Sequence, residues 1–151
     1  MENLIEKLKN EDIDTNQLGI LSEIGEKLTN GGKISKELEL EILQLFESEN
    51  DFVRIKCTEI SEFSKADEII DKLIERLKND SNYFVRGFSA KALGAIGNLR
   101  VKDSLEEALD DKEGFVVSFA MQALKNINLK SAFSSKLNML KSKLKAGSKN
   151  G

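Results

Sequence analysis

The stretch Tyr83-Phe84-Val85-Arg86-Gly87-Phe88-Ser89-Ala90-Lys91-Ala92-Leu93-Gly94-Ala95-Ile96-Gly97 decides the fold, because its opening phrase returns along the chain. Related phrases are Asp51-Phe52-Val53-Arg54 and Gly114-Phe115-Val116-Val117, so the Phe residues are spaced 32 and then 31 apart. A fixed period of this length is typical of units that cannot bury their apolar faces alone and stack on their neighbours. The sequence therefore predicts a tandem repeat.

Apolar residues recur at helical spacing in two segments of each repeat. In the central repeat the first row is Ile70, Leu73, Ile74 and Leu77, and the second is Val85, Ser89, Ala92, Leu93 and Ile96. The chain has no proline, so helix ends must be set by Gly, Asn, Asp and Ser. Such residues cluster at 30–32, 48–50, 79–82, 97–98, 110–111 and 147–148. The pattern predicts helices separated by short breaks and no strand.

These breaks predict a single domain over residues 1–146, made of about four helical hairpins and a C-terminal capping helix. The expected parts are a degenerate hairpin at 1–33, repeats at 35–65, 66–98 and 99–128, a capping helix at 129–146 and a disordered tail at 147–151. The capping helix is predicted from the amphipathic row Leu129, Phe133, Leu137, Leu140 and Leu144. Phe46 and Phe133 are expected on core faces.

The composition is that of an ordinary globular protein, with 151 residues, 40% of them hydrophobic and 32% charged. A single Cys57 and no His exclude a disulfide framework and argue against a metal site, so no cofactor is expected. The N-terminus lacks the pattern of a signal peptide and no apolar run has the length of a membrane span. We therefore expect a cytoplasmic protein with no membrane association.

Charge is spread unevenly along the chain, although the net formal charge is only −3. Residues 1–50 carry 12 acids and 5 bases, whereas residues 130–151 carry 6 Lys and no acid. A basic tail can touch nucleic acid, yet a pI near 5.2 argues against dedicated nucleic-acid binding. We interpret the tail as a solvated helix that frays after Gly147.

The segment from Asp71 to Asn98 resembles the HEAT-like repeats of α-solenoid proteins. The Val85-Arg86 pair opens the second helix, an Ala-rich stretch follows, and the run from Ala92 to Gly97 closes it. Residues 40–65 and 103–128 fit more loosely, since the chain lacks the usual prolines and has Val117 in place of Arg. The resemblance implies an all-α, right-handed α-α superhelix.

The resemblance also implies which positions of the second helices face a concave groove that binds a partner. The candidate partner-binding residues are Phe52, Ile55, Lys56, Glu59, Tyr83, Phe84, Phe88, Lys91, Phe115, Phe119 and Gln122. At about 100° per residue, Phe84, Phe88 and Lys91 form a stripe separate from the buried row of the same helix. Rings of this number could cover on the order of 1,000 Å², more than the largest apolar patch of a typical monomer. Either another chain covers them, as a different protein or a second copy, or the array's own elements do.

The expected function is a non-catalytic protein-protein interaction module, such as an adaptor or a complex subunit. One alternative is an inhibitor or immunity-type protein that neutralises a basic partner. Another is weak nucleic-acid association through Arg54, Arg86 and the C-terminal lysines, although Arg54 and Arg86 also fit a ladder of bonds between adjacent repeats. An enzyme is not expected, because no acid, base or nucleophile stands in a persuasive setting and Cys57 lies on a core row.

Overall fold

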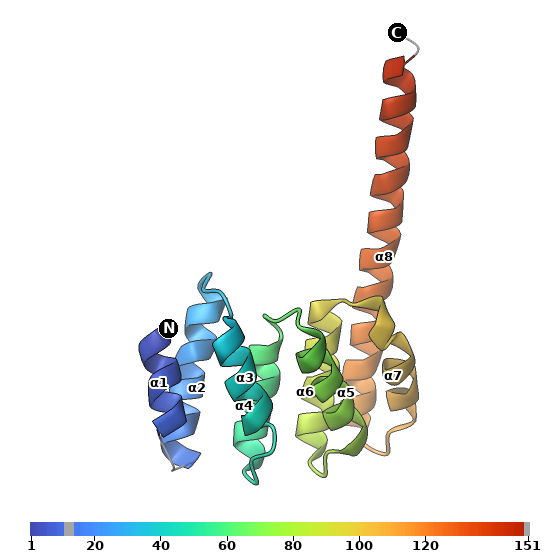
Figure 1. Ribbon diagram of the computed structural model, residues 1–151. Coiled ribbons are helices and arrows are strands. Elements are labelled where there is room, and N and C mark those ends of the chain that lie inside the picture. Colours follow the sequence, from blue (N-terminus) through green and yellow to red (C-terminus); the bar gives the residue numbers. More distant parts are fainter. Residues whose placement is uncertain (11–13, 150–151) are drawn as a thin grey trace.

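The computed structural model describes residues 1–10 and 14–149, and within these ranges every regular element is a helix (Figure 1). The helices are α1 (Glu2–Asn10), α2 (Asp14–Thr29), α3 (Lys36–Leu45), α4 (Asp51–Ser61), α5 (Asp67–Asn79), α6 (Tyr83–Ile96), α7 (Lys102–Glu107) and α8 (Gly114–Lys149). Short 3₁₀ turns flank α7, at Leu99–Val101 and Ala108–Asp110.

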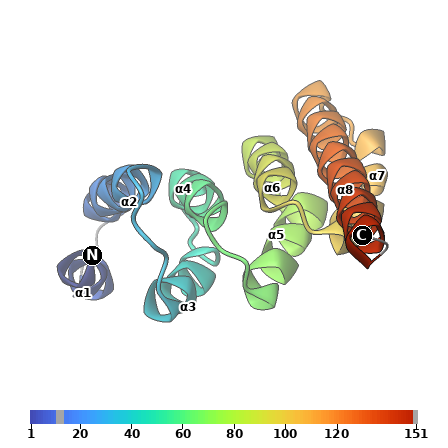
Figure 2. The same cartoon turned by 90° about the horizontal axis from the view of Figure 1, so that it is seen from above.

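The helices form two layers that advance from one end of the molecule to the other. Viewed from above, α1, α3 and α5 lie in one row and α2, α4 and α6 lie in the other, with α7 and α8 at the far end (Figure 2). The buried residues between the layers include Leu38, Ile42, Phe46, Val53, Cys57, Leu73, Val85, Leu93, Leu105 and Val116. This arrangement confirms the predicted all-α solenoid. It also places the N-terminus and α8 at opposite ends of the array.

Asparagine side chains fix where the second helices begin. The Asn50 side chain accepts a hydrogen bond from the Phe52 N–H at 2.9 Å, and the Asn82 side chain accepts one from the Phe84 N–H at 2.8 Å. Each cap satisfies one of the N–H groups that the first turn leaves without an intrahelical partner. Gly97 ends α6 in the left-handed conformation, with φ of 75°, which glycine adopts without steric cost.

A ladder of arginine and aspartate side chains ties each second helix to the next repeat. Arg54 donates to both carboxylate oxygens of Asp80, from Nε at 2.9 Å and from Nη2 at 3.0 Å. Arg86 makes the same bidentate pair with Asp111, at 2.8 and 3.0 Å. Arg86 also donates to the Asp80 carbonyl at 2.9 Å. The predicted ladder between repeats is therefore present. Both arginine residues are buried in it, with 7% of their surface exposed.

The ladder keeps its carboxylates ionised. Burial raises the pKa of Asp80, but hydrogen bonds from Arg54 and from the Asn82 N–H outweigh it, so the pKa lies below its ordinary value. The hydrogen bond from Arg86 lowers the pKa of Asp111 in the same way. Each aspartate is thus a charged acceptor at neutral pH.

The predicted capping helix at 129–146 is wrong as a separate element. Helix α8 runs without a break from Gly114 to Lys149, and its second half extends beyond the array (Figure 1). The physical reason is local, since neither Gly nor Pro stands near Asn128 to end the helix. We call residues 129–149 the arm.

Two smaller expectations about this region are also wrong. Phe133 is 69% exposed on the arm, whereas Phe46 is fully buried as expected. The helix passes through Gly147 and Ser148 to Lys149, so the expected disordered tail does not begin at residue 147. Residues 150–151 lie outside the described residues.

Candidate functional site

The candidate site begins with aromatic rings that α6 and α8 bring together. Ring centroids lie 4.2 Å apart for Tyr83 and Phe84, 5.0 Å for Phe84 and Phe115, and 5.5 Å for Phe88 and Phe115. Phe119 closes the group, 4.9 Å from Phe115 and 5.7 Å from Phe88. Most of these contacts are edge-to-face or tilted, the geometry that the ring quadrupole favours. We call these residues the aromatic patch.

The rings of the patch cover one another only in part. Tyr83 and Phe84 are 37% and 39% exposed, and Phe88, Phe115 and Phe119 are half-buried. The array's own elements therefore cover the rings in part, because the rings pack between repeats, and the uncovered part presents an apolar surface to solvent. The patch is not enclosed by the subunit.

Two glycines that sequence reasoning passed over allow this packing. A Cβ on Gly87 would lie 2.5 Å from the ring of Phe115, and one on Gly94 would lie 2.6 Å from the Cα of Ala123. These distances are too short for a side chain, so both positions need glycine for α8 to approach α6 this closely. The resemblance implies that Gly87, like Phe84 and Phe88, faces the groove. In the sequence, the sign of this close packing was a glycine, which has no side chain, between Phe84 and Phe88.

The remaining apolar candidates lie on α4, away from the touching rings. Phe52 is 68% exposed in the first turn of the helix, and Ile55 is half-buried. Neither takes part in the ring contacts described for the aromatic patch. Phe52 is therefore an isolated exposed ring.

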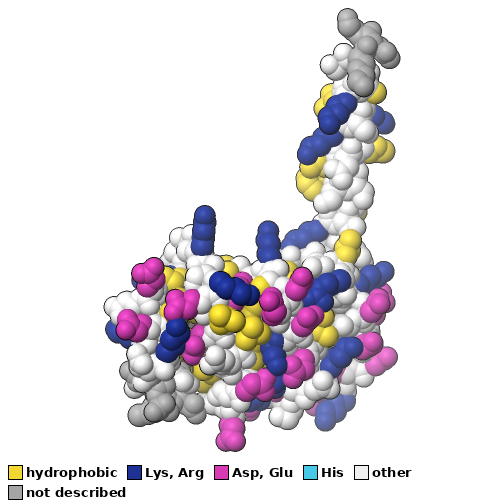
Figure 3. Space-filling view, viewed as in Figure 1, with side chains coloured by type: hydrophobic (Ala, Val, Ile, Leu, Met, Phe, Trp, Pro, Cys, Tyr) yellow, Lys and Arg dark blue, Asp and Glu magenta, His cyan; other side chains and the backbone are white. Residues whose placement is uncertain are grey.

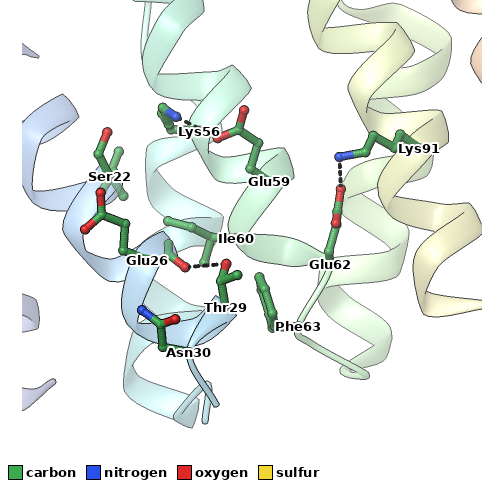
Figure 4. A pocket seen from close by; sticks show the side chains of 12 residues that line it. Ser22, Glu26, Thr29, Asn30, Lys56, Glu59, Ile60, Glu62, Phe63 and Lys91 are labelled. Carbon is green, nitrogen blue, oxygen red and sulfur yellow. Dashed lines mark hydrogen bonds and ion pairs between the residues drawn. The ribbon is translucent and has the colours of Figure 1, made fainter. Parts of the chain in front are cut away.

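Three of the polar candidates, Lys56, Glu59 and Lys91, line a cavity of about 700 Å³ between α2, α4 and α6 (Figure 4). Lys56 Nζ lies 2.7 Å from Glu59 Oε2, and Lys91 Nζ lies 2.9 Å from Glu62 Oε1. The second pair bridges α6 and the end of α4. A smaller cavity of about 200 Å³ lies beside it, lined by Lys91, Phe119 and Gln122 among others. Lys91 lines both cavities, and Phe119 of the aromatic patch lines the smaller one. The two cavities and the aromatic patch therefore form one continuous surface, which we call the inner surface.

Sequence reasoning missed the share of α2 in this surface. Ser22, Glu26, Thr29 and Asn30 line the larger cavity together with Phe63 of the first repeat. Phe63 stands nine residues beyond Arg54, a position that the resemblance implies faces the groove. The α2 residues carry no repeat motif, so no spacing rule could place them.

Other residues considered for chemistry are buried. Cys57 is fully buried, and burial strongly raises the pKa of its thiol. Over residues 1–10 and 14–149, no group of three or more His, Cys, Asp or Glu side chains is placed to hold a metal ion. In the same part of the chain, no helix combines the length and the apolar character needed to cross a membrane.

Comparison with known proteins identifies the repeats. The model of the HEAT repeats matches residues 38–125, which is more than half of the chain. No curated protein sequence matches the chain. Among solved structures, human deoxyhypusine hydroxylase in complex with glycerol superposes with a TM-score of 0.67 and 21% identity, over 84% of this chain and 43% of that one. At that identity the likeness concerns the fold alone, and the chain spans less than half the length of that neighbour. The repeated Val-Arg helices, the layered pairs and the match of the family model together show that this chain belongs to the HEAT repeat family.

Proposed function

We propose that the chain is a non-catalytic protein-binding module whose inner surface binds a segment of a partner protein. The observation that carries the proposal is the aromatic patch, a set of touching rings with Tyr83 and Phe84 still more than a third exposed. HEAT repeats generally mediate protein-protein interaction. Aromatic residues gathered on one surface are the usual anchors of such contacts.

The polar residues beside the patch suit the rim of such a contact. Covering a fully exposed Phe contributes roughly 1.5 to 3 kcal/mol, and the half-covered rings contribute correspondingly less. Association costs several kcal/mol, so the rings together support micromolar binding. Lys56, Glu59, Lys91 and Gln122 surround the apolar area with groups that set the orientation of a partner.

The proposal is tested by panning a library of displayed peptides on the full chain. We expect selected peptides to be rich in aromatic and aliphatic residues and to lose at least about tenfold in affinity when Phe84→Asp is introduced, because a charge then faces the apolar side of the peptide. Leu99→Asp is the matched control, since Leu99 is 56% exposed outside the inner surface. Both variants should remain folded by circular dichroism, and Phe84→Asp should have the lower thermal midpoint because its ring packs against Tyr83 and Phe115. Selection of no peptide, or equal loss in both variants, would contradict the proposal.

The same proposal assigns no catalysis and no nucleic-acid contact to Arg54 and Arg86, the arginines at equivalent positions of two repeats. The guanidinium groups of Arg54 and Arg86 are bonded to Asp80 and Asp111, and the Cys57 thiol is both buried and protonated. An inhibitor that neutralises a basic partner through its acidic N-terminal half is a special case of the proposed binding activity. A cytoplasmic site of action stays a prediction from the sequence.

A further inference from the structure

The arm presents an apolar row that its own molecule leaves uncovered. Exposed fractions along this row run from 39% to 74%, for Leu129, Phe133, Leu137, Leu140 and Leu144. At 100° per residue these side chains fall within an arc of about 80°, the width of a helix-helix seam. Most helical stability in proteins comes from packing an apolar face, and within this molecule the row stays exposed. The row is therefore a docking surface for another element.

Lysines border this row on both sides. On the same wheel Lys130 and Lys141 follow one edge of the arc, and Lys136 and Lys143 follow the other, while Ser, Asn and Lys145 are on the opposite side. The positions correspond to the flanks of a coiled-coil seam, which select the charge of the partner. The occupant of the row must therefore bring carboxylates.

The chain itself carries those carboxylates at its other end. Residues 1–75 contain 19 acidic and 9 basic residues, a formal charge of −10, and residues 76–113 contain 7 of each. Residues 114–151 contain 7 lysines and no acid. Because the array advances from one end to the other, the acidic half of the sequence begins at the end opposite the arm (Figure 1). Figure 3 shows lysines and no acidic side chain on the described part of the arm, and both charges on the visible face of the array. The acidic end and the basic arm complement each other.

The arm cannot use that complementarity within its own molecule. It continues α8 as one straight helix that points away from the array, at the end opposite α1 (Figure 1). Pairing of one arm with another is disfavoured too, since lysines would face lysines along the whole seam in either orientation. The acidic surface of a second copy has neither obstacle.

We infer that the inner surface binds the arm of a second copy of this chain. The inference rests on the proposed function of the inner surface and names its partner. Lysines of the arm lie against Glu26 and against Glu59 and Glu62, where they share these two carboxylates with Lys56 and Lys91, and the apolar row lies against Phe63 and the aromatic patch. Reciprocal exchange of two arms closes a two-fold dimer, the commonest symmetry of homo-oligomers.

Dimensions agree with this placement. The arm has 21 residues, and at 1.5 Å per residue it is about 31 Å long. Packed helices lie 8 to 10 Å apart, so the row from α2 to α8 is about 30 Å across. One arm can therefore reach from the larger cavity to the aromatic patch.

The first test measures the mass of the full chain by sedimentation equilibrium. We expect a dimer at roughly 100 μM protein in ~0.1 M salt, and at least tenfold weaker association in ~1 M salt, where the Debye length falls from about 10 Å to about 3 Å. The double variant Leu137→Asp with Leu140→Asp should be monomeric. The matched control is Asn138→Asp with Ser142→Asp, which adds the same charge on the opposite side of the arm and should leave the dimer at most a fewfold weaker.

The second test uses a labelled synthetic peptide with the sequence of residues 129–149. The full chain carrying Leu137→Asp and Leu140→Asp serves as receptor, because its own arm is disabled while its inner surface is intact. We expect binding that weakens at least tenfold on Phe84→Asp or on Glu26→Lys with Glu59→Lys in the receptor. Circular dichroism and the thermal midpoint of each receptor show that it is folded.

The outcomes separate this inference from the proposed function. A monomeric chain that does not bind the arm peptide, yet binds displayed peptides through Phe84, overturns the inference and leaves the proposed function standing. A dimer that persists in the Glu26→Lys, Glu59→Lys chain means that arms pair with each other, and overturns it as well. So does a monomer whose arm binds phosphatidylserine vesicles. Loss of all peptide binding contradicts both proposals.

Discussion

The two halves of α8 carry the same kind of apolar row and meet different fates. Up to Asn128 the row of Val116, Ala120, Ala123 and Ile127 is at most 2% exposed, because α6 and α7 pack against it. From Leu129 onward a second apolar row with helical spacing, about 110° around the helix from the first, stands open to solvent. Apolar periodicity thus shows which face of a helix is suited to burial. It does not show whether another part of the same chain buries it.

Helix length explains the difference. Helix α6 ends at Ile96 after 14 residues, whereas α8 runs for 36. At 1.5 Å per residue the surplus is about 33 Å of helix that extends past the end of α6. Its first turn still contacts α6, since Lys130 Nζ donates to the Ala95 carbonyl at 2.8 Å. The arm exists because the neighbouring helix stops and α8 does not.

The largest difference in unfolding free energy between the array and the surface is expected for a substitution in the arginine-aspartate ladder. Asp80→Ala removes the bidentate partner of the buried Arg54 and leaves it with Asp51, whose side chain is 47% exposed, so we expect a loss near the lower end of about 3 to 5 kcal/mol in the free energy of unfolding. Urea unfolding of each variant measures it. Asp71→Ala is the control, because its partner Arg100 lies on the surface and such pairs contribute about 0 to 1 kcal/mol. Equal costs for the two would refute the structural role given to the ladder.

Leucines compared between the array and the arm give the next largest difference. Leu93→Ala removes a fully buried side chain and should cost about 2 to 5 kcal/mol of unfolding free energy. Leu144→Ala changes a side chain that is 74% exposed, and should stay within about 0.5 kcal/mol when the protein is dilute enough to be monomeric. A large cost for Leu144→Ala under those conditions would mean that the arm packs within its own molecule.

Glycines should respond with opposite signs in the two regions. Gly94→Ala forces a methyl group against the backbone of Ala123, so we expect a loss of about 1 to 3 kcal/mol in unfolding free energy. Gly147→Ala meets no atom within 4 Å and should raise the helicity of the arm, by about 0.5 to 1 kcal/mol in helix stability. Thermal unfolding and circular dichroism measure the two effects. Stabilisation by Gly94→Ala would contradict the close approach of α6 and α8.

Acid should loosen the array while leaving the charge of the arm unchanged. The pKa values of Asp80 and Asp111 lie below their ordinary value of 3.8, so the folded state binds fewer protons than the unfolded state in this range. Their contribution is therefore present above about pH 4 and is lost as the pH falls through the folded-state pKa values. Urea midpoints measured from pH 5 to pH 2 should fall less steeply in Asp111→Asn, after correction for its lower starting stability, than in the parent. An unchanged slope would contradict the pairing of Asp111 with Arg86.

Several features of this protein follow from its sequence alone. The period of the Phe-Val-Arg phrase, the apolar rows and the breaks at Gly and Asn predict the helices, the stacked layers and the family. The Arg ladder could be anticipated because Arg54 and Arg86 occupy equivalent positions. The aromatic stripe was visible on a helical wheel, since a helix fixes the angle between successive side chains.

Only the tertiary structure decided how those helices meet. It placed Gly87 under the ring of Phe115, brought α2 to the edge of the cavity and left the arm without a neighbour. Local spacing determines which side of a helix is apolar, because that depends on a few consecutive residues. What covers that side depends on the length and position of other helices, and those are fixed by packing across the whole array.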